Sequence, residues 1–215
     1  MKYAVFSTLL LFVTFGACAQ QRFEKDIRAF KEKDKVERPP EKPILFIGSS
    51  SFTRWEKVQQ DFPGYVVLNR GFGGSTLEDV ILYQDDIIFP YSPRQIVIYC
   101  GENDIASGAS ADDVLARFDK LFTSIRSQLP DVPVVYISMK PSPSREKFRS
   151  ELERGNALIR DYLSQKKNTQ YVDVFSQMLN GRNKPSPELY VSDSLHMSDA
   201  GYAIWQRAIQ PTLQK

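Results

Sequence analysis

The chain has 215 residues, of which 42% are apolar and 12% aromatic, and its formal net charge is +2. A chain of this length and composition can bury the core of one globular domain without a disulfide or a structural metal. The small net charge argues against a nucleic-acid partner, because proteins that bind nucleic acids usually carry a strongly basic surface. We therefore expect one folded domain that does not bind nucleic acid.

Residues 1–19 have the pattern of an export signal peptide. Lys2 supplies a positive charge, and the apolar stretch Ala4–Phe15 that follows it is too short to span a bilayer comfortably. Two processing routes are open. Small residues favour cleavage after Ala19, whereas a lipoprotein-type box would place a lipid anchor on Cys18. Both routes predict an exported protein that is periplasmic or extracellular, and the second route attaches it to a membrane.

Residues 20–42 form a densely charged arm ahead of the main domain. Phe23, Ile27 and Phe30 recur at spacings of four and three residues, which predicts a short amphipathic helix with one apolar stripe. Prolines at positions 39, 40 and 43 then end the helix, since proline lacks an amide donor and restricts the residue before it. We expect the arm to pack on the domain through its apolar stripe.

The main domain, residues 43–215, alternates short apolar runs with helical patterns. The apolar runs are rich in β-branched or aromatic residues and lack alternation, as in strands that are buried on both faces. They are Ile44–Ile47, Val66–Leu68, Ile96–Tyr99, Val134–Ile137 and Tyr171–Phe175. Helices are predicted over Thr76–Ile88, Asp112–Leu129, Ser144–Leu163 and Ala200–Leu213, with capping boxes at Thr76/Asp79 and Ser110/Asp113. The expected fold is α/β, a flavodoxin-like three-layer α/β/α arrangement around a five-stranded parallel sheet.

Polar and glycine-rich segments follow the predicted strands. They are Gly48–Ser51, Asn69–Thr76, Gly101–Asp104 and, across a loop after the last strand, Asp193–His196. Ligands of open parallel sheets bind beyond the carboxyl ends of the strands. The segments therefore mark the edge of the sheet where a functional site is expected.

His196 is the only histidine of the chain, so any acid–base chemistry by imidazole at neutral pH must use it. Asp193 lies three residues earlier, close enough in one turn to accept a hydrogen bond from the imidazole ring. A serine hydroxyl needs such a base to act as a nucleophile. Sequence chemistry alone does not distinguish Ser49, Ser50 and Ser51 as that nucleophile.

Four short motifs resemble the conserved blocks of the SGNH (GDSL-like) hydrolase family. The segment ending at Ser50 resembles the first block, with serine where many members have aspartate, and Gly74 resembles the glycine of the second. Gly101–Asp104 resembles the third block and Asp193–His196 the last. The blocks occur in the family's order from residue 43 onward, and the likeness is greatest to small bacterial GDSL-type esterases that also resemble platelet-activating-factor acetylhydrolases.

The resemblance implies roles for these residues. Ser50 would be the nucleophile, His196 its base and Asp193 the residue that orients the base. The oxyanion hole would consist of the backbone amides of Ser50 and Gly74 and the side-chain amide of Asn103. The implied activity is hydrolysis of short-acyl esters, acetyl esters above all, through an acyl-enzyme. The substrate would be a small-molecule or glycan ester, with no cofactor and no metal.

Other functions compete with this interpretation. A lysophospholipase or thioesterase of the same family would use the same residues. A non-catalytic flavodoxin-like module would use Gly48–Ser51 and Gly71–Thr76 to hold a phosphate, but it leaves Asp193 and His196 unexplained. A carbohydrate-binding protein that has lost its activity would not need the complete set of catalytic residues. A metal site is disfavoured, because the chain has one histidine and no cluster of cysteines.

Four further residues have simpler predicted roles. Arg54 is expected to be a surface charge and Trp55 a core aromatic residue. Cys100 lies within an apolar run, which is typical of an unreactive buried thiol. Lys140 follows the fourth run, and we expect a solvated loop lysine there.

Overall fold

The computed structural model describes residues 14–215, with side chains from residue 22 onward. Most of the predicted signal peptide, residues 1–19, lies outside the described residues, and the side chain of Cys18 is not among those described. The signal peptide and the lipid anchor therefore stay predictions. Within the described part of the chain, no helix is long and apolar enough to cross a membrane.

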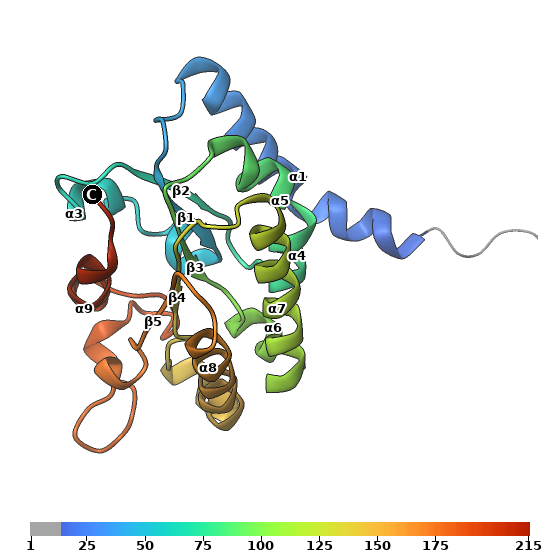
Figure 1. The fold of residues 1–215 in the computed structure, drawn as a ribbon. Helices are drawn as coiled ribbons and strands as arrows, with labels where there is room; N and C mark the ends of the chain where they lie inside the picture. Colours follow the sequence, from blue (N-terminus) through green and yellow to red (C-terminus); the bar gives the residue numbers. More distant parts are fainter. Residues whose placement is uncertain (1–13) are drawn as a thin grey trace, which may run out of the picture.

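Five parallel strands form the sheet at the centre of the molecule, in the order β2-β1-β3-β4-β5 (Figure 1). Their bounds are β1 Ile44–Gly48, β2 Val67–Gly71, β3 Gln95–Tyr99, β4 Val134–Ile137 and β5 Thr169–Val172. The predicted five-stranded parallel sheet is confirmed. Helices connect each strand to the next, because the chain must cross over the sheet before it can form another parallel strand.

Helices cover both faces of this sheet, and Figure 1 shows α4, α5 and α7 on one side and α3 and α9 on the other. Successive residues along a strand point to opposite faces, so Phe46 and Val97 belong to one core and Ile47 and Ile98 to the other. Two apolar layers explain why the strands show no alternation in the sequence. The helices are α1 Thr14–Val36, α2 Ser50–Thr53, α3 Val58–Asp61, α4 Leu77–Leu82, α5 Gln84–Ile87, α6 Glu102–Ala106, α7 Ala111–Gln128, α8 Arg149–Ser164 and α9 Asp199–Ile209.

Helix α1 is the predicted arm, and it is longer than the sequence suggested. Phe23 and Ile27 are buried against the domain, as their spacing predicts. The carboxylate of Asp34 pairs with the guanidinium of Arg70 and accepts a hydrogen bond of 2.6 Å from the Tyr91 hydroxyl. An apolar stripe and a charged contact thus hold α1 on the face that also carries α4 and α5.

Both predicted capping boxes are present, at the starts of α4 and α7. The single helix predicted over Thr76–Ile88 is wrong in one respect, because the backbone leaves helical geometry at Tyr83 (φ −103°, ψ 10°) and divides it into α4 and α5. The last strand was also predicted too far along the chain. It ends at Val172, since Asp173 accepts hydrogen bonds from the amide and hydroxyl of Ser176 and turns the backbone.

The predicted start of a helix at Ser144 is wrong. Residues Pro143–Phe148 form a 3₁₀ segment in which Arg145 departs from helical geometry, and α8 begins only at Arg149. The amide of Ser144 donates to the carbonyl of Ser194. At the carboxyl end, α9 stops at Ile209 and a 3₁₀ turn follows, because proline at position 211 lacks an amide donor.

Candidate active site

The site begins at the sharp turn after β1. Gly48 has φ +133°, and a Cβ atom there would lie 1.8 Å from the carbonyl oxygen of Tyr99 on the adjacent strand. Only glycine fits this position. Because the chain turns so abruptly, α2 begins at Ser50, directly beyond the carboxyl end of the strand.

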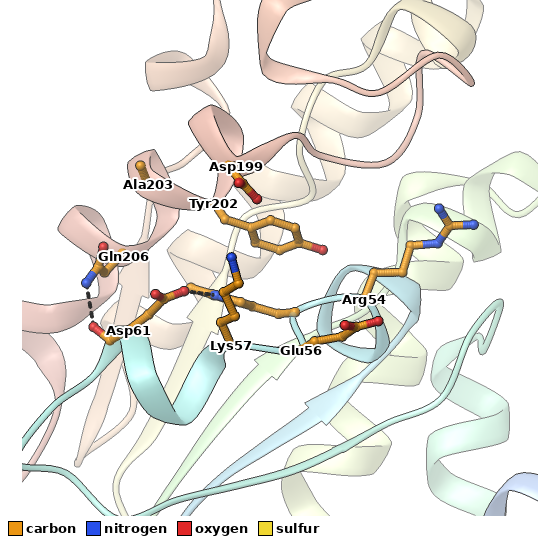
Figure 2. Close-up of a pocket in the computed structure, with 9 residues that line it drawn as sticks. Arg54, Glu56, Lys57, Asp61, Asp199, Tyr202, Ala203 and Gln206 are labelled. Carbon is orange, nitrogen blue, oxygen red and sulfur yellow. Dashed lines mark hydrogen bonds between the residues drawn. The ribbon is translucent and has the colours of Figure 1, made fainter.

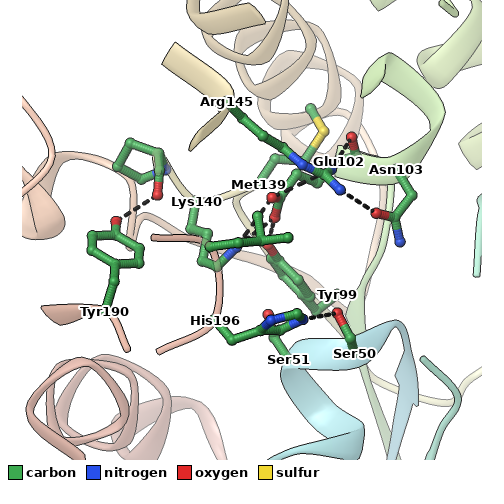
Figure 3. Close-up of polar contacts among 12 residues, drawn as sticks. Ser50, Ser51, Tyr99, Glu102, Asn103, Met139, Lys140, Arg145, Tyr190 and His196 are labelled. Atoms are coloured by element: carbon green, nitrogen blue, oxygen red, sulfur yellow. Dashed lines mark hydrogen bonds and ion pairs between the residues drawn. The ribbon is translucent and has the colours of Figure 1, made fainter. Parts of the chain in front are cut away.

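Ser50, His196 and Asp193 form a continuous line of hydrogen bonds. The Oγ atom of Ser50 lies 3.0 Å from Nε2 of His196 (Figure 3), and Nδ1 of His196 lies 2.6 Å from a carboxylate oxygen of Asp193. A carboxylate can only accept, so Nδ1 carries the ring proton and Nε2 is left as an acceptor for the serine hydroxyl. The arrangement can remove a proton from Ser50.

The loop that carries the histidine is held in a fixed shape. Asp193 accepts hydrogen bonds of 2.9 Å from the backbone amides of Leu195 and His196. Ser194 between them has φ +56°, a left-handed conformation that is uncommon for a residue with a side chain. The amide of Val191 donates to the carbonyl of His196 and closes the loop.

Asp193 is charged over the whole physiological pH range. Partial desolvation raises the pKa of its carboxyl group, but the hydrogen bonds from the His196 ring and from the two backbone amides outweigh this effect and hold the pKa well below its usual range. The guanidinium of Arg54 lies 3.9 Å from the Asp193 carboxylate, and its side chain is more than half exposed to solvent, which weakens the interaction. The charge of Asp193 therefore stays available to stabilise a protonated His196.

The segment after β2 passes beside Ser50. Gly74 has φ +84°, and a Cβ atom added at the preceding Gly73 would lie 3.9 Å from the Cβ atom of Ser50. The amide of Ser50 lies in the first turn of α2, where backbone amides have no acceptor within the helix. The two predicted backbone donors thus sit on adjacent turns at the same edge of the sheet.

Asn103 joins this edge from α6. Its amide nitrogen donates to the carbonyl of Ser75 at 2.9 Å, and its oxygen accepts from the guanidinium of Arg145 at 2.8 Å. In Figure 3 the amide nitrogen of Asn103 points toward Ser50. A planar amide group has two N–H donors, so the contact with Ser75 leaves one for a ligand at this edge.

A buried charged network lies behind these donors, and few features of the sequence indicate it. Lys140 is 1% exposed and donates to the carboxylate of Glu102 at 2.8 Å, so the prediction of a solvated lysine is wrong. The Tyr99 hydroxyl donates to the same carboxylate. Burial raises the pKa of Glu102, but Lys140 and Arg145 outweigh it and hold the pKa below its usual range. The one sequence signal was Glu102 itself, an acidic residue three positions after the end of a fully buried strand.

A cleft of about 300 Å³ lies between α2, α3 and α9 (Figure 2). Trp55 forms part of its wall and is buried in the core, as predicted. The Tyr202 hydroxyl donates to the carbonyl of Ser51 at 2.8 Å, which fixes α9 beside the turn that carries Ser50. The lining combines both charges with aromatic and amide groups: Arg54, Trp55, Glu56, Lys57, Asp61, Asp199, Tyr202, Ala203 and Gln206.

Cys100 follows β3 near the site. Cys100 is buried and burial raises the pKa of its thiol, in agreement with an unreactive core residue. Among the described residues, no group of three or more His, Cys, Asp and Glu side chains could hold a metal ion.

Comparison with known proteins gives a family match over most of the chain. Residues 46–204 match the model described as the GDSL-like Lipase/Acylhydrolase family. No curated protein sequence matches the chain.

Solved structures with the same fold are distant in sequence. A protein from Streptococcus pneumonia whose name refers to platelet activating factor is 21% identical, with a TM-score of 0.80 over 93% of this chain and 96% of that one. A GDSL-like lipase from Bacteroides thetaiotaomicron is 22% identical, with a TM-score of 0.72 over 86% and 96%. An acetylxylan esterase from Geobacillus stearothermophilus is 17% identical, with a TM-score of 0.64 over 79% and 93%. These likenesses establish the three-layer α/β/α fold.

Proposed function

The chain belongs to the GDSL-like lipase/acylhydrolase family and is a carboxylic ester hydrolase, and we propose that it cleaves short-acyl esters with Ser50 as nucleophile, His196 as base and Asp193 as the residue that orients the base. The observation that supports this proposal most strongly is the position of His196. Its two ring nitrogens lie within hydrogen-bond distance of Ser50 and Asp193. This is the geometry that activates a serine hydroxyl.

The first half of the reaction forms an acyl-enzyme. Nε2 of His196 takes the proton of Ser50 as Oγ attacks the acyl carbon of the ester, and the carbonyl oxygen becomes an oxyanion. When the tetrahedral intermediate collapses, the bond to the alkoxy oxygen breaks and His196 gives its proton to the leaving alcohol. Asp193 stabilises the positive charge on the histidine while it holds this proton.

The second half repeats these steps with water. His196 removes a proton from a water molecule whose oxygen attacks the acyl carbon. The second tetrahedral intermediate then collapses, Ser50 leaves with the proton held by His196, and the carboxylic acid is released. The nucleophile and the base are thereby restored.

We propose that the oxyanion is held by the amides of Ser50 and Gly74 and by the side chain of Asn103. The negative charge appears on one oxygen only during the reaction, so donors fixed in advance around it stabilise the transition state more than the substrate. Gly74 in its left-handed conformation and Asn103 bonded to Ser75 support this role. Asn103 is also suited to it chemically, since its neutral amide keeps both N–H protons throughout the physiological pH range.

The substrate we propose is a short-acyl, above all an acetyl, ester of a small molecule or glycan. The cleft contains none of the proposed catalytic residues but is lined by Arg54, whose guanidinium lies 3.9 Å from the Asp193 carboxylate. Its mixed polar lining suits a hydrated carrier better than a lipid chain. The name of the Geobacillus stearothermophilus relative, an acetylxylan esterase, agrees with this choice. Export to the periplasm or the cell exterior, with release after Ala19 or a lipid anchor at Cys18, would bring the enzyme to such a glycan.

The direct test compares the purified wild type with Ser50→Ala on three kinds of substrate: acetylated xylan, p-nitrophenyl acetate and a lysophospholipid. We expect the wild type to release acetate from the first two and the variant to be inactive. Preferential release of long-chain fatty acid from the lysophospholipid would indicate the lysophospholipase alternative. Absence of any hydrolysis by the wild type would favour a binding module.

A further inference from the structure

The segment after β4, residues 140–145, contacts both halves of the site, and we call it the β4 loop. We propose that Arg145 in this loop is a positioning residue that fixes the side-chain amide of Asn103 for the oxyanion. This inference rests on the proposed ester hydrolysis and adds a residue outside the four sequence blocks.

Arg145 determines which end of the Asn103 amide faces which neighbour. Its guanidinium donates to the amide oxygen of Asn103 and to the backbone carbonyl of Glu102, each at 2.8 Å. A guanidinium has only donors, so the amide oxygen must face Arg145 and the nitrogen must face away from it. One N–H of that nitrogen is bonded to the Ser75 carbonyl. The geometry of a planar amide then directs the second N–H to one position.

Two side chains of the β4 loop contact Glu102, the residue directly before Asn103. Lys140 at the start of the loop pairs with the Glu102 carboxylate at 2.8 Å, and Arg145 at its end lies 3.4 Å from the same carboxylate. Figure 3 shows the two cations on either side of Glu102. Lys140 and Glu102 are nearly fully buried, where a charged contact is strong and a misplaced charge is costly. The β4 loop is therefore held rigidly to the start of α6, which carries Asn103.

The same loop also contacts the turn that carries the base. The amide of Ser144 donates to the carbonyl of Ser194 at 3.1 Å, and the Tyr190 hydroxyl donates to the carbonyl of Pro141. Ser194 lies between Asp193 and His196 in the chain and has the left-handed backbone described above. One short segment thus fixes the base and the oxyanion donor relative to each other.

Loss of the contact between Arg145 and Asn103 should weaken stabilisation of the transition state more than binding of the substrate. The hydrogen bond from a charged donor both orients the amide and increases the polarity of its N–H. We expect Arg145→Gln to lower kcat about tenfold while KM changes by less than about twofold. Arg145→Lys keeps the charge but not the pair of parallel donors, so it should recover only part of the loss.

A double-mutant cycle tests whether Arg145 acts through Asn103. The cycle measures kcat for wild type, Arg145→Gln, Asn103→Ala and the double variant on p-nitrophenyl acetate. If Arg145 acts by positioning the amide, the double variant should have the kcat of Asn103→Ala alone. Arg154→Gln is the matched control, because Arg154 is a half-exposed arginine that also pairs with a carboxylate, that of Asp112, at 2.6 Å. Its kcat should equal that of the wild type.

A second readout does not depend on activity. The side-chain amide signals of Asn103 in a ¹⁵N–¹H NMR spectrum, identified by their loss in Asn103→Ala, should be sharp in the wild type and shifted or broadened in Arg145→Gln. Unchanged signals, or losses of kcat that multiply in the double variant, would overturn the role of Arg145. Failure of the proposed function is recognised separately, since the wild type itself would then hydrolyse no ester.

Discussion

The Oγ atom of Ser50 lies 3.0 Å from Nε2 of His196 although 146 residues separate them in the chain. The neighbouring Ser49 and Ser51 are buried. A fluorophosphonate probe should therefore label Ser50 alone, because only this hydroxyl has both a base and access to solvent. Peptide mapping by mass spectrometry would locate the label. Ser50→Ala should abolish it, and Ser51→Ala, a neighbouring control, should retain it; labelling of either neighbour would contradict the assignment.

The low pKa of Asp193 predicts the shape of the pH profile. Because the carboxylate stays charged on acidification, the loss of kcat/KM on the acidic side should follow one ionisation, that of the base. A plot of log kcat/KM against pH should have a limiting slope of about one there. A slope near two would mean that Asp193 gains a proton in the same range.

Asp193→Asn tests the role of the contact between Asp193 and His196 directly. The substitution preserves the size of the side chain but removes the charge that stabilises protonated His196. We expect kcat to fall by roughly 10²–10⁴ while KM changes little. The control is Asp112→Asn, because Asp112 also pairs with a basic side chain, that of Arg154 at 2.6 Å, but lies outside the cleft and the proposed catalytic residues. Similar kcat values for the two variants would refute the pairing.

Removal of the buried Lys140 should destabilise the protein strongly. Lys140→Met leaves the Glu102 carboxylate without its main cation, and loss of one partner of a buried ion pair costs about 3–5 kcal/mol. Urea unfolding followed by tryptophan fluorescence would measure the free energy of unfolding. The double variant Lys140→Met/Glu102→Gln should recover part of the loss, since neither member of the pair is then charged. A cost below about 1 kcal/mol would show that Lys140 is dispensable.

The ion pair between Lys140 and Glu102 should also make the stability of the protein depend on pH. The pKa of Glu102 in the folded protein is below its usual range, so its ionised form stabilises the fold above about pH 4.3, the pKa in an unfolded chain. This stabilisation is lost as the pH falls through the folded pKa. Without Lys140 the buried Glu102 carboxyl should take up a proton at higher pH than in the wild type. The gap in unfolding free energy between wild type and Lys140→Met should therefore be largest at neutral pH and narrow on acidification. A gap independent of pH would indicate that Lys140 acts only through packing.

Acyl chain length gives a separate test of the substrate class. A site open to water gains little from added methylenes, whereas a closed apolar tunnel would gain up to about 0.8 kcal/mol for each buried CH₂ group. We expect kcat/KM for p-nitrophenyl esters to fall steeply from acetyl to octanoyl. A rise with chain length would instead favour a lipase or a thioesterase.

Local sequence patterns were sufficient to predict the five strands, their parallel sheet and the main helices. Parallel strands that are covered on both faces must be apolar throughout, so runs such as Val134–Ile137 could be read directly, and capping boxes such as Ser110/Asp113 marked helix starts. The predictions failed at element boundaries. The backbone leaves helical geometry at Tyr83, and a turn at Asp173 ends the last strand early. Ser144 was expected to begin a helix, but Arg145 departs from helical geometry and α8 begins only at Arg149.

For the candidate site too, some features follow from the sequence and others only from the tertiary structure. The sequence determined which residue types were available, because one histidine with an aspartate three positions before it and polar segments after each strand limited the chemistry to a few groups. Only the tertiary structure decided which groups meet. Lys140 and Glu102 lie 38 residues apart and each would be solvated in an isolated segment, but adjacent strands bring both into the interior, where burial without a partner is too costly for either charge.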